Sequence, residues 1–241
     1  MWPVASSARP SWQWLLRLPF IAVSATFVGC AALGLPSANQ RDPVPVSEAT
    51  LYLDAVRGLI AQGQYYAAIA HIQEDRRIHG DTAELRLLEA DARRKLKQNK
   101  TSEALYQGVI RGGADGGLAA KARHGLGLLY APVNLVAALK ELREATRLKP
   151  TDAEFRSDYG YALMQSRRLT EARIELSTAN ELAPDNIAAR NNLLILLFAV
   201  GDEAAAQRLA ATAAVDSTLL ARLKTQAQSF KTSKSAPARA G

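Results

Sequence analysis

Few side chains in this sequence could carry out catalysis or bind a metal ion. Its three histidines, His71, His79 and His124, form neither an HxxH nor an HExxH motif. The single cysteine, Cys30, excludes an intramolecular disulfide and a zinc site built from cysteines. No nucleophile, base and acid can be read together anywhere in the chain. The sequence therefore predicts no catalytic residue, no metal site and no cofactor.

One glycine-containing stretch, GLGLLY at residues 125–130, resembles a dinucleotide-binding loop only superficially. It lacks the GxGxxG spacing, and no strand pattern precedes it. Glycine within a helical pattern favours the close packing of two helices. We therefore interpret the stretch as a helix-packing site, and we expect no small-molecule substrate.

The charge of the chain is concentrated at its ends. The formal net charge is +7, and hydrophobic residues make up 48% of the sequence. Residues 1–29 contain two basic residues and residues 222–241 contain five, and neither segment contains an acid. Without these seven, the 30 basic residues fall to the same number as the 23 acids, so residues 30–221 are formally neutral. A nucleic-acid-binding domain would carry its basic residues on the folded body, so this class is disfavoured.

The N-terminal segment has the pattern of an export or anchoring signal. Residues 18–35 contain no charged side chain. An uncharged run of this length is just long enough to span a bilayer as a helix, which would anchor the chain in the inner membrane. A shorter apolar run that ends in small residues is typical of a signal peptide, here residues 1–29.

Cys30 favours the second alternative. The run Phe27-Val28-Gly29-Cys30 resembles the lipobox of bacterial lipoproteins, although Phe27 stands where leucine is usual. The resemblance implies that Cys30 becomes the lipidated N-terminus. The prolines and polar residues that follow predict an extended linker, so that residues 30–48 form the lipidated N-terminus and linker. By resemblance to enterobacterial lipoproteins, Ala32, two residues past the cysteine, implies attachment to the periplasmic face of the outer membrane.

A repeat of fixed length organises the rest of the chain. Pro150 and Pro184 lie 34 residues apart, and each ends a helical run and precedes polar residues that suit a helix start. This is the tetratricopeptide period, and Leu126-Gly127 and Tyr159-Gly160 occupy the family's Leu-Gly site. The resemblance implies an all-α fold, a right-handed superhelix of antiparallel helix pairs. The predicted repeats are residues 49–80, 83–113, 120–152, 153–186 and 187–220, followed by a basic disordered tail over residues 222–241.

In tetratricopeptide arrays the first helix of each pair lines the concave face. Mapping the family's inward positions onto this chain gives, in the third and fourth repeats, Lys121, His124, Leu128, Glu154, Ser157, Tyr161, Met164 and Gln165. In the fifth repeat the same mapping gives Ala188, Asn191, Ile195 and Phe198. We predict a partner-binding groove at His124, Ser157, Tyr161, Gln165 and Asn191, suited to an extended or helical protein segment. For Met164 and Phe198, packing between helices is the better interpretation.

A narrower resemblance concerns residues 119–208. The segments RHGLGLLY, SDYGYALMQSRRLTEAR and APDNIAARNNLLILLFAVGDEAAAQ resemble TadD-like proteins, the tetratricopeptide lipoproteins of Flp/Tad pilus assembly. This resemblance implies a non-catalytic scaffold for the pilus secretion machinery at the outer membrane, with the secretin or its accessory protein as partner. The alternatives are a pilotin-like lipoprotein of a type IVa pilus and a general envelope chaperone or adaptor. An enzyme is the least favoured class.

Overall fold

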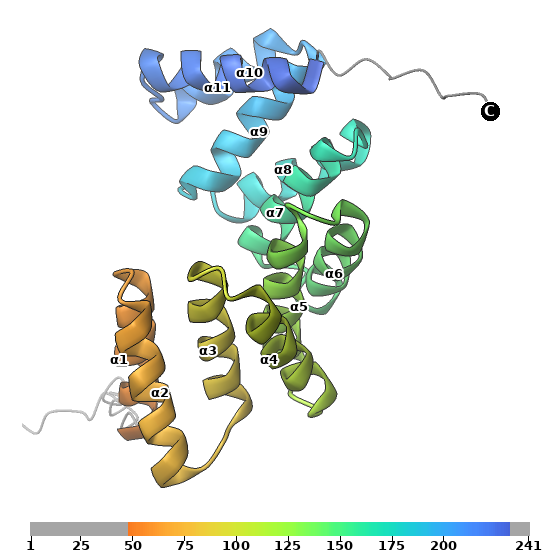
Figure 1. The fold of residues 1–241 in the computed structure, drawn as a ribbon. Helices are drawn as coiled ribbons and strands as arrows, with labels where there is room; N and C mark the ends of the chain where they lie inside the picture. Colours follow the sequence, from red (N-terminus) through yellow and green to blue (C-terminus); the bar gives the residue numbers. More distant parts are fainter. Residues whose placement is uncertain (1–47, 232–241) are drawn as a thin grey trace, which may run out of the picture. The chain divides into compact units, whose positions relative to one another are not determined.

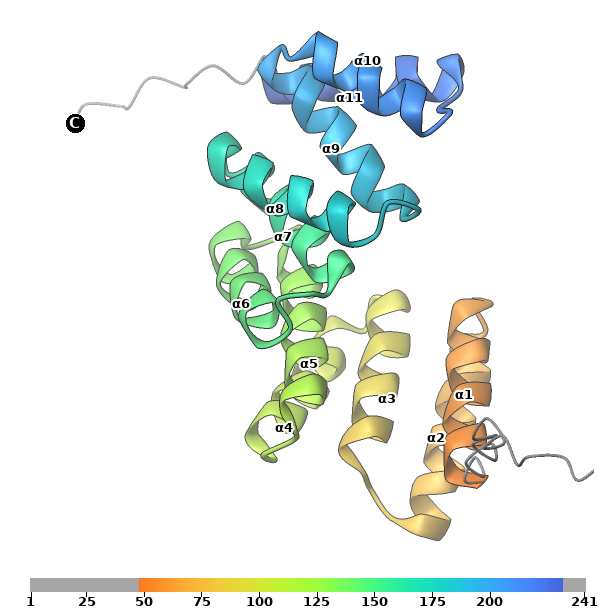
Figure 2. The same cartoon turned by 180° about the vertical axis from the view of Figure 1, so that it is seen from behind.

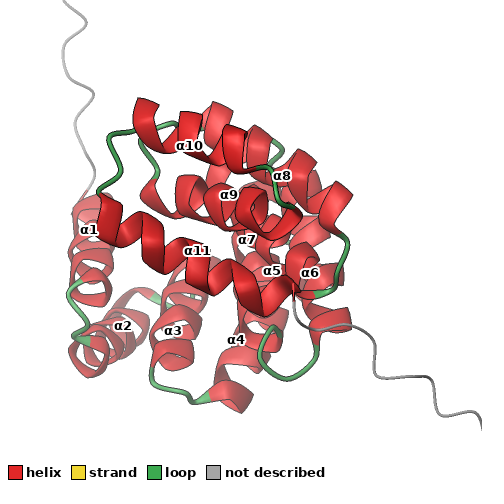
Figure 3. Cartoon of the chain, turned by 90° about the horizontal axis from the view of Figure 1, so that it is seen from above, coloured by secondary structure: helices red, strands yellow, loops and turns green. Residues whose placement is uncertain are grey.

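The structure is a computed structural model that describes residues 48–231 (Figure 1). The predicted leader at residues 1–29, the predicted lipid-attachment residue Cys30 and residues 31–47 of the predicted linker lie outside the described residues, as do residues 232–241. Every regular element in the described range is a helix, and Figure 3 shows no strand among them. This confirms the predicted all-α class. None of the described helices combines the length and the apolar character needed to cross a membrane.

The helices follow one another as short antiparallel pairs. Four of the pairs are joined by turns of three or four residues, and the last pair by an even shorter one. The eleven described helices are α1 (Glu48–Ala61), α2 (Tyr65–His79), α3 (Ala83–Lys95), α4 (Asn99–Arg111), α5 (Gly116–Tyr130), α6 (Leu135–Leu148), α7 (Ala153–Gln165), α8 (Leu169–Leu182), α9 (Ile187–Val200), α10 (Glu203–Thr212) and α11 (Ser217–Lys231).

Polar caps explain where several of these helices begin. The Asp152 carboxylate accepts a hydrogen bond from the backbone N–H of Phe155 at 3.2 Å, and this starts α7. The Asn186 side chain does the same for α9, accepting from Ala189 at 3.1 Å. Both caps are at the polar residues that follow the prolines, as predicted. Asp115 caps α5, so the third pair begins at Gly116 and not near residue 120.

The two glycines of the Leu-Gly sites lie at close helix crossings. A Cβ atom at Gly127 in α5 would lie 2.5 Å from Cγ of Leu142 in α6. A Cβ atom at Gly160 in α7 would lie 2.6 Å from Cγ of Leu176 in α8. Both leucines are fully buried. Each glycine therefore admits a leucine of its partner helix, which confirms the predicted close packing.

The pairs stack in sequence order. Each of α3, α5, α7 and α9 packs on the second helix of the pair before it and on its own partner helix (Figure 2). The first helices of successive pairs also contact one another, α1 with α3, α3 with α5, and α7 with α9. We call this row of first helices, α1, α3, α5, α7 and α9, the inner row.

The C-terminal end differs from the sequence-based boundary. Residues 222–231, expected to belong to a disordered tail, form most of α11, which corrects that prediction. Leu223 and Ala227 of this helix are buried. Their spacing of four residues places them on one helix face, and the helix is stabilised because that face packs against α9. Arg222, Lys224 and Lys231, with no acid among residues 222–231, gave this stretch its tail-like composition.

Candidate partner-binding groove

The inner row forms a groove over its first four helices. The groove has a volume of about 430 Å³ and receives side chains from α1, α3, α5 and α7. We call it the open groove. Its apolar lining comes from Ile60, Ala61, Leu87, Leu88, Leu118, Leu128 and Phe155, and its charged lining comes from Arg57, Glu84, Asp91, Arg94, Lys95, Lys121, Asp152 and Glu154, with His124 among them.

Two of the groove's basic residues are already engaged. Arg57 forms an ion pair with Glu84 at 3.0 Å, between α1 and α3. Arg94 Nε donates a hydrogen bond to the Tyr106 hydroxyl at 3.1 Å, and that hydroxyl donates to Asp91 at 2.5 Å. Burial, above all, raises the pKa of Tyr106, and the neighbouring Asp91 carboxylate raises it further, so the phenol stays protonated as a donor. This network fixes the α3 wall of the groove.

Two other basic residues are available to a ligand. Lys95 and Lys121 are exposed, and neither forms an ion pair with another residue of the range 48–231. They lie on α3 and α5 beside the apolar side chains of the groove. The open groove therefore offers apolar contact area with unpaired positive charge at its side.

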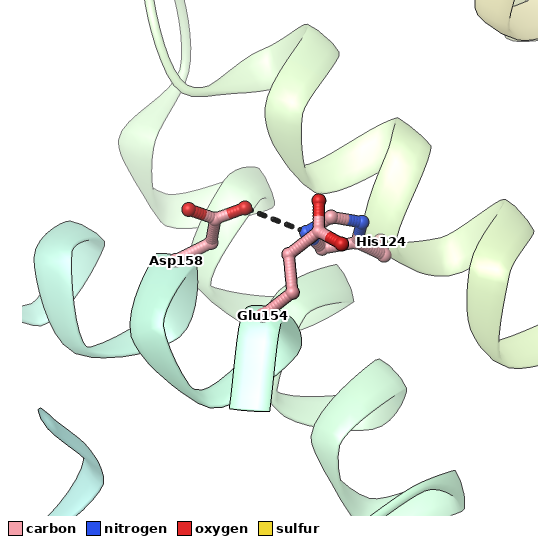
Figure 4. A group of neighbouring side chains, drawn as sticks. All are labelled: His124, Glu154 and Asp158. Atoms are coloured by element: carbon pink, nitrogen blue, oxygen red, sulfur yellow. Dashed lines mark hydrogen bonds and ion pairs between the residues drawn. The ribbon is translucent and has the colours of Figure 1, made fainter. Parts of the chain in front are cut away.

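His124 lies where α5 meets α7 (Figure 4). Its ring stacks on Phe155, with 4.4 Å between ring centroids and 27° between planes. Its Nε2 atom lies 2.8 Å from Oδ2 of Asp158, and Glu154 lies one helical turn before that carboxylate. The imidazole is buried at 7% exposure, while Glu154 is exposed. The group therefore links two repeats at the edge of the groove.

The same three side chains could coordinate a cation. One ligand atom from each of His124, Glu154 and Asp158 lies within 4.8 Å of the others. The sequence predicts no metal site, because these residues are separated along the chain and form no motif. The His124–Asp158 hydrogen bond already pairs two of the three groups and joins two repeats. We assign the group the structural role.

The repeat period contains the signal for this contact. His124 and Asp158 are 34 residues apart, and Ser157 and Asn192 are 35 apart, with Asn192 Nδ2 donating to the Ser157 hydroxyl at 3.0 Å. Residues one period apart occupy corresponding positions on neighbouring first helices, so their side chains can meet. Polar pairs at this spacing could have been identified from the sequence.

The structure separates the five predicted groove residues. His124 lines the open groove, together with Lys121, Leu128 and Glu154 from the inward mapping. Ser157 is buried in the contact between repeats. Tyr161 lies beneath α11, where its ring meets Phe230 edge-on at 5.9 Å.

The remaining two predicted residues are at least partly accessible. Gln165 is exposed, and Asn191 is half-buried beside Arg190. Other groove residues come from α1 and α3 and were not predicted from the sequence; examples are Arg57, Leu87 and Arg94. The first two repeats lack the Leu-Gly site, so their register and inward positions were not assigned.

The geometry defines a helical-repeat protein with a groove on one row of helices, and comparison with known proteins identifies the repeat. A tetratricopeptide repeat model matches residues 134–194. The TPR repeat-containing protein PA4299 of Pseudomonas aeruginosa is 35% identical over 188 residues, which cover 77% of this chain and 74% of that protein. The chain therefore belongs to the tetratricopeptide repeat family.

Solved structures share the fold at low sequence identity. TTC0263, a thermophilic TPR protein of Thermus thermophilus, is 19% identical with a TM-score of 0.55, covering 75% of this chain and 97% of that one. MamA from Desulfovibrio magneticus RS-1 is 17% identical with a TM-score of 0.54, covering 74% and 98%. YrrB, described as a TPR protein with an unusual peptide-binding site, is 18% identical with a TM-score of 0.52, covering 74% and 92%. These likenesses bear out the predicted tetratricopeptide superhelix.

Proposed function

We propose that this protein is a scaffold that holds a segment of another protein in the open groove. Proteins of this fold are generally non-catalytic scaffolds that bind protein partners. The observation that carries the proposal is the groove itself, in which four successive first helices present apolar side chains beside the unpaired Lys95 and Lys121. The peptide-binding site named for YrrB supports the same use of a related fold.

The lining of the groove suggests the chemistry of the bound segment. Leu87, Leu128 and Phe155 provide apolar contacts, and the two lysines provide donors for carboxylates. An extended or helical segment with apolar side chains on one face and acidic side chains at its edge matches this lining. Glu84 and Asp91 are already paired with arginines, so they repel such a segment less than free carboxylates would.

The place of action that we propose is the assembly of the Flp/Tad pilus secretion machinery at the outer membrane. The support is the TadD-like sequence of residues 119–208 and the lipobox-like run that ends at Cys30. The secretin or its accessory protein is the expected source of the bound segment. A lipid on Cys30 would hold the repeats at the periplasmic face of that membrane.

Site-specific photo-crosslinking tests the groove. A photoreactive amino acid replaces Leu128 in the open groove, and in a control variant it replaces Val136 on α6, which is 81% exposed and does not line the groove. In cells that make the pilus, we expect position 128 to capture a discrete protein that position 136 does not capture. Equal capture at both positions, or capture at neither, would contradict binding in the groove.

Acyl labelling tests the anchor separately. The Cys30→Ser variant should lose a radiolabelled fatty acid and leave the outer-membrane fraction, since residue 30 is the only cysteine in the chain. Retained labelling would exclude lipidation at this residue. The groove experiment is independent of this result, because the crosslinker sits in the repeats.

A further inference from the structure

The C-terminal helix does not continue the stack. At every earlier boundary, the next helix packs on the second helix of the pair before it, as α9 does on α8. The helix α11 instead packs mainly on α9, the first helix of its own repeat, and makes little contact with α10 (Figure 3). It therefore lies against the inner row, where a ligand of a tetratricopeptide array would lie.

The burial of α9 agrees with this position. Residues 193–198 form an unbroken buried run around the helix, whereas α5 and α7 keep inward side chains such as Leu128 and Gln165 accessible. A helix that is buried all round must be covered on every side. For α9 the cover comes from α7, α8, α10 and α11.

The residues beneath α11 include two inward positions of the repeat. Lys224 of α11 lies 5.6 Å from the centroid of the Phe198 ring. Phe230 meets the Tyr161 ring edge-on, and Gln226 Nε2 donates to the Tyr161 hydroxyl at 3.3 Å. We call the surface of α7 and α9 around Tyr161 and Phe198 the covered face.

The side chains of α11 have the pattern of a groove-bound helix. The apolar residues that pack on the C-terminal core are Leu219, Leu220, Leu223, Ala227 and Phe230. Their spacing of three and four residues is the one by which an amphipathic helix inserts into a groove. Lys224 lies at the edge of this apolar face, where it contacts the Phe198 ring and pairs with Glu203, and Arg222 is exposed on the opposite side.

The attachment of α11 to α7 is light. The contacts include the Tyr161–Phe230 ring pair and the Gln226–Tyr161 bond, and Arg167 in the turn after α7 donates to the Ser229 carbonyl at 3.3 Å; both bonds are exposed. The ion pair of Lys224 with Glu203 at 3.0 Å is also exposed, so it contributes little. α11 is therefore held mainly by its apolar face on α9, where Leu223 and Ala227 are buried, and weakening that face should release the helix from the covered face.

We propose that the covered face is a second binding site, specific for an amphipathic basic helix of a partner protein, and that α11 is its internal occupant. This inference rests on the proposed scaffold function but concerns a different surface. The partner helix resembles α11 chemically, with apolar residues at the same spacing and lysine or arginine between them. It binds after α11 leaves, so α11 restrains binding until such a partner competes for its place.

Competition with a synthetic α11 peptide tests this proposal. A fluorescent peptide of residues 217–231 is titrated with the full chain, and its anisotropy gives the dissociation constant. In the wild-type protein the tethered helix competes at a high effective concentration, so the peptide binds weakly. In a Leu223→Ala, Phe230→Ala variant, whose own α11 is weakened, we expect roughly ten-fold tighter binding.

Matched controls make the result specific to the covered face. Arg222→Ala changes an exposed residue of α11 and should leave the affinity at the wild-type value. A peptide of scrambled sequence should not bind either protein. Adding Phe198→Ala to the weakened variant should abolish the gain in affinity, because it removes part of the face itself.

Three results would overturn the proposal. The first is equal peptide affinity of the wild-type and weakened proteins. The second is a loss of circular-dichroism signal in the weakened variant beyond that of the 15 residues of α11, which would make this helix an integral part of the fold. The third is a wild-type dimer in which α11 of each copy lies on the covered face of the other copy. The occupant of the face would then be a second copy of this chain and not a partner protein. Crosslinking from Leu128 is unaffected by all three, so the proposed function stands or falls separately.

Discussion

The open groove and the covered face belong to the same inner row of helices but present different chemistry. The open groove exposes lysines and a glutamate beside its apolar side chains, and nothing in the described range fills it. The covered face presents aromatic rings at Tyr161 and Phe198, and α11 shields them. Exposed aromatic rings in one patch favour association. One row of helices can therefore hold both an open site and a site occupied by the chain's own helix α11. The inward side chains decide which of the two forms.

The largest predicted effect is on the free energy of unfolding, and it compares an aromatic residue beneath the open groove with one on the covering helix α11. Phe155 is 4% exposed and stacks on His124, so Phe155→Ala should lower the free energy of unfolding by about 3–5 kcal/mol. Phe230 is only half-buried and meets one ring edge-on, so Phe230→Ala should cost roughly 1 kcal/mol. Urea denaturation measures both. Equal losses would mean that α11 is packed as tightly as the repeats.

A glycine pair tests the helix crossing on which both sites depend. Gly160→Ala would bring a methyl group against Leu176, and overpacking of this kind costs about 1–3 kcal/mol. The control is Gly108→Ala in α4, where no atom lies within 4 Å of the new methyl group. That change should be stabilising by up to about 1 kcal/mol, because alanine favours the helix. The same sign of effect at both positions would contradict the close crossing.

The hydrogen bond at the edge of the open groove should couple its partners more strongly than the bond on the covered face. A double-mutant cycle of His124→Ala and Asp158→Ala should give a coupling of about 1 kcal/mol, since the imidazole is buried. The exposed Gln226–Tyr161 bond should give a coupling near zero in the cycle of Gln226→Ala and Tyr161→Phe. A reversed order would mean that α11 is the better anchored of the two.

The smallest effect concerns acid stability at the loop between α2 and α3, which leads into the α3 wall of the open groove. Burial raises the pKa of Asp81, but hydrogen bonds and charge from Arg86 and Arg76 outweigh it and hold that pKa below the ordinary 3.8. A lowered pKa stabilises the fold above pH 3.8, and this stabilisation is lost as the pH falls through the folded value. Asp81→Asn should cost less than about 1 kcal/mol at pH 7 and should lose less stability than wild type during acidification. Identical acid titrations would exclude this contribution.

The third and fourth repeats were predictable because their packing is encoded in single residues. Gly127 and Gly160 mark helix crossings, and the prolines mark helix ends, so a 34-residue period fixed both the fold and the inward positions of α5 and α7. The contact of His124 with Asp158 follows from the same period. The inward positions could therefore be predicted best in the two repeats whose motif is strongest.

The groove residues from α1 and α3 and the position of α11 depend on tertiary packing, which the sequence pattern does not reveal. The repeats of α1 to α4 carry no Leu-Gly site, so the sequence did not assign Arg57 or Arg94 to the groove. The position of α11 could not be predicted because its composition is that of a basic tail, and tertiary contact, above all with α9, stabilises the helix there.

Hydrogen–deuterium exchange tests most directly whether the inner row is the binding surface. The protein captured from position 128 is purified and added to the full chain, and amide protection is compared between the two rows of helices. We predict slower exchange in α3, α5 and α7 on binding, with α4, α6 and α8 unchanged. Protection confined to α4, α6 and α8, or no added protection with a partner that binds, would contradict the account.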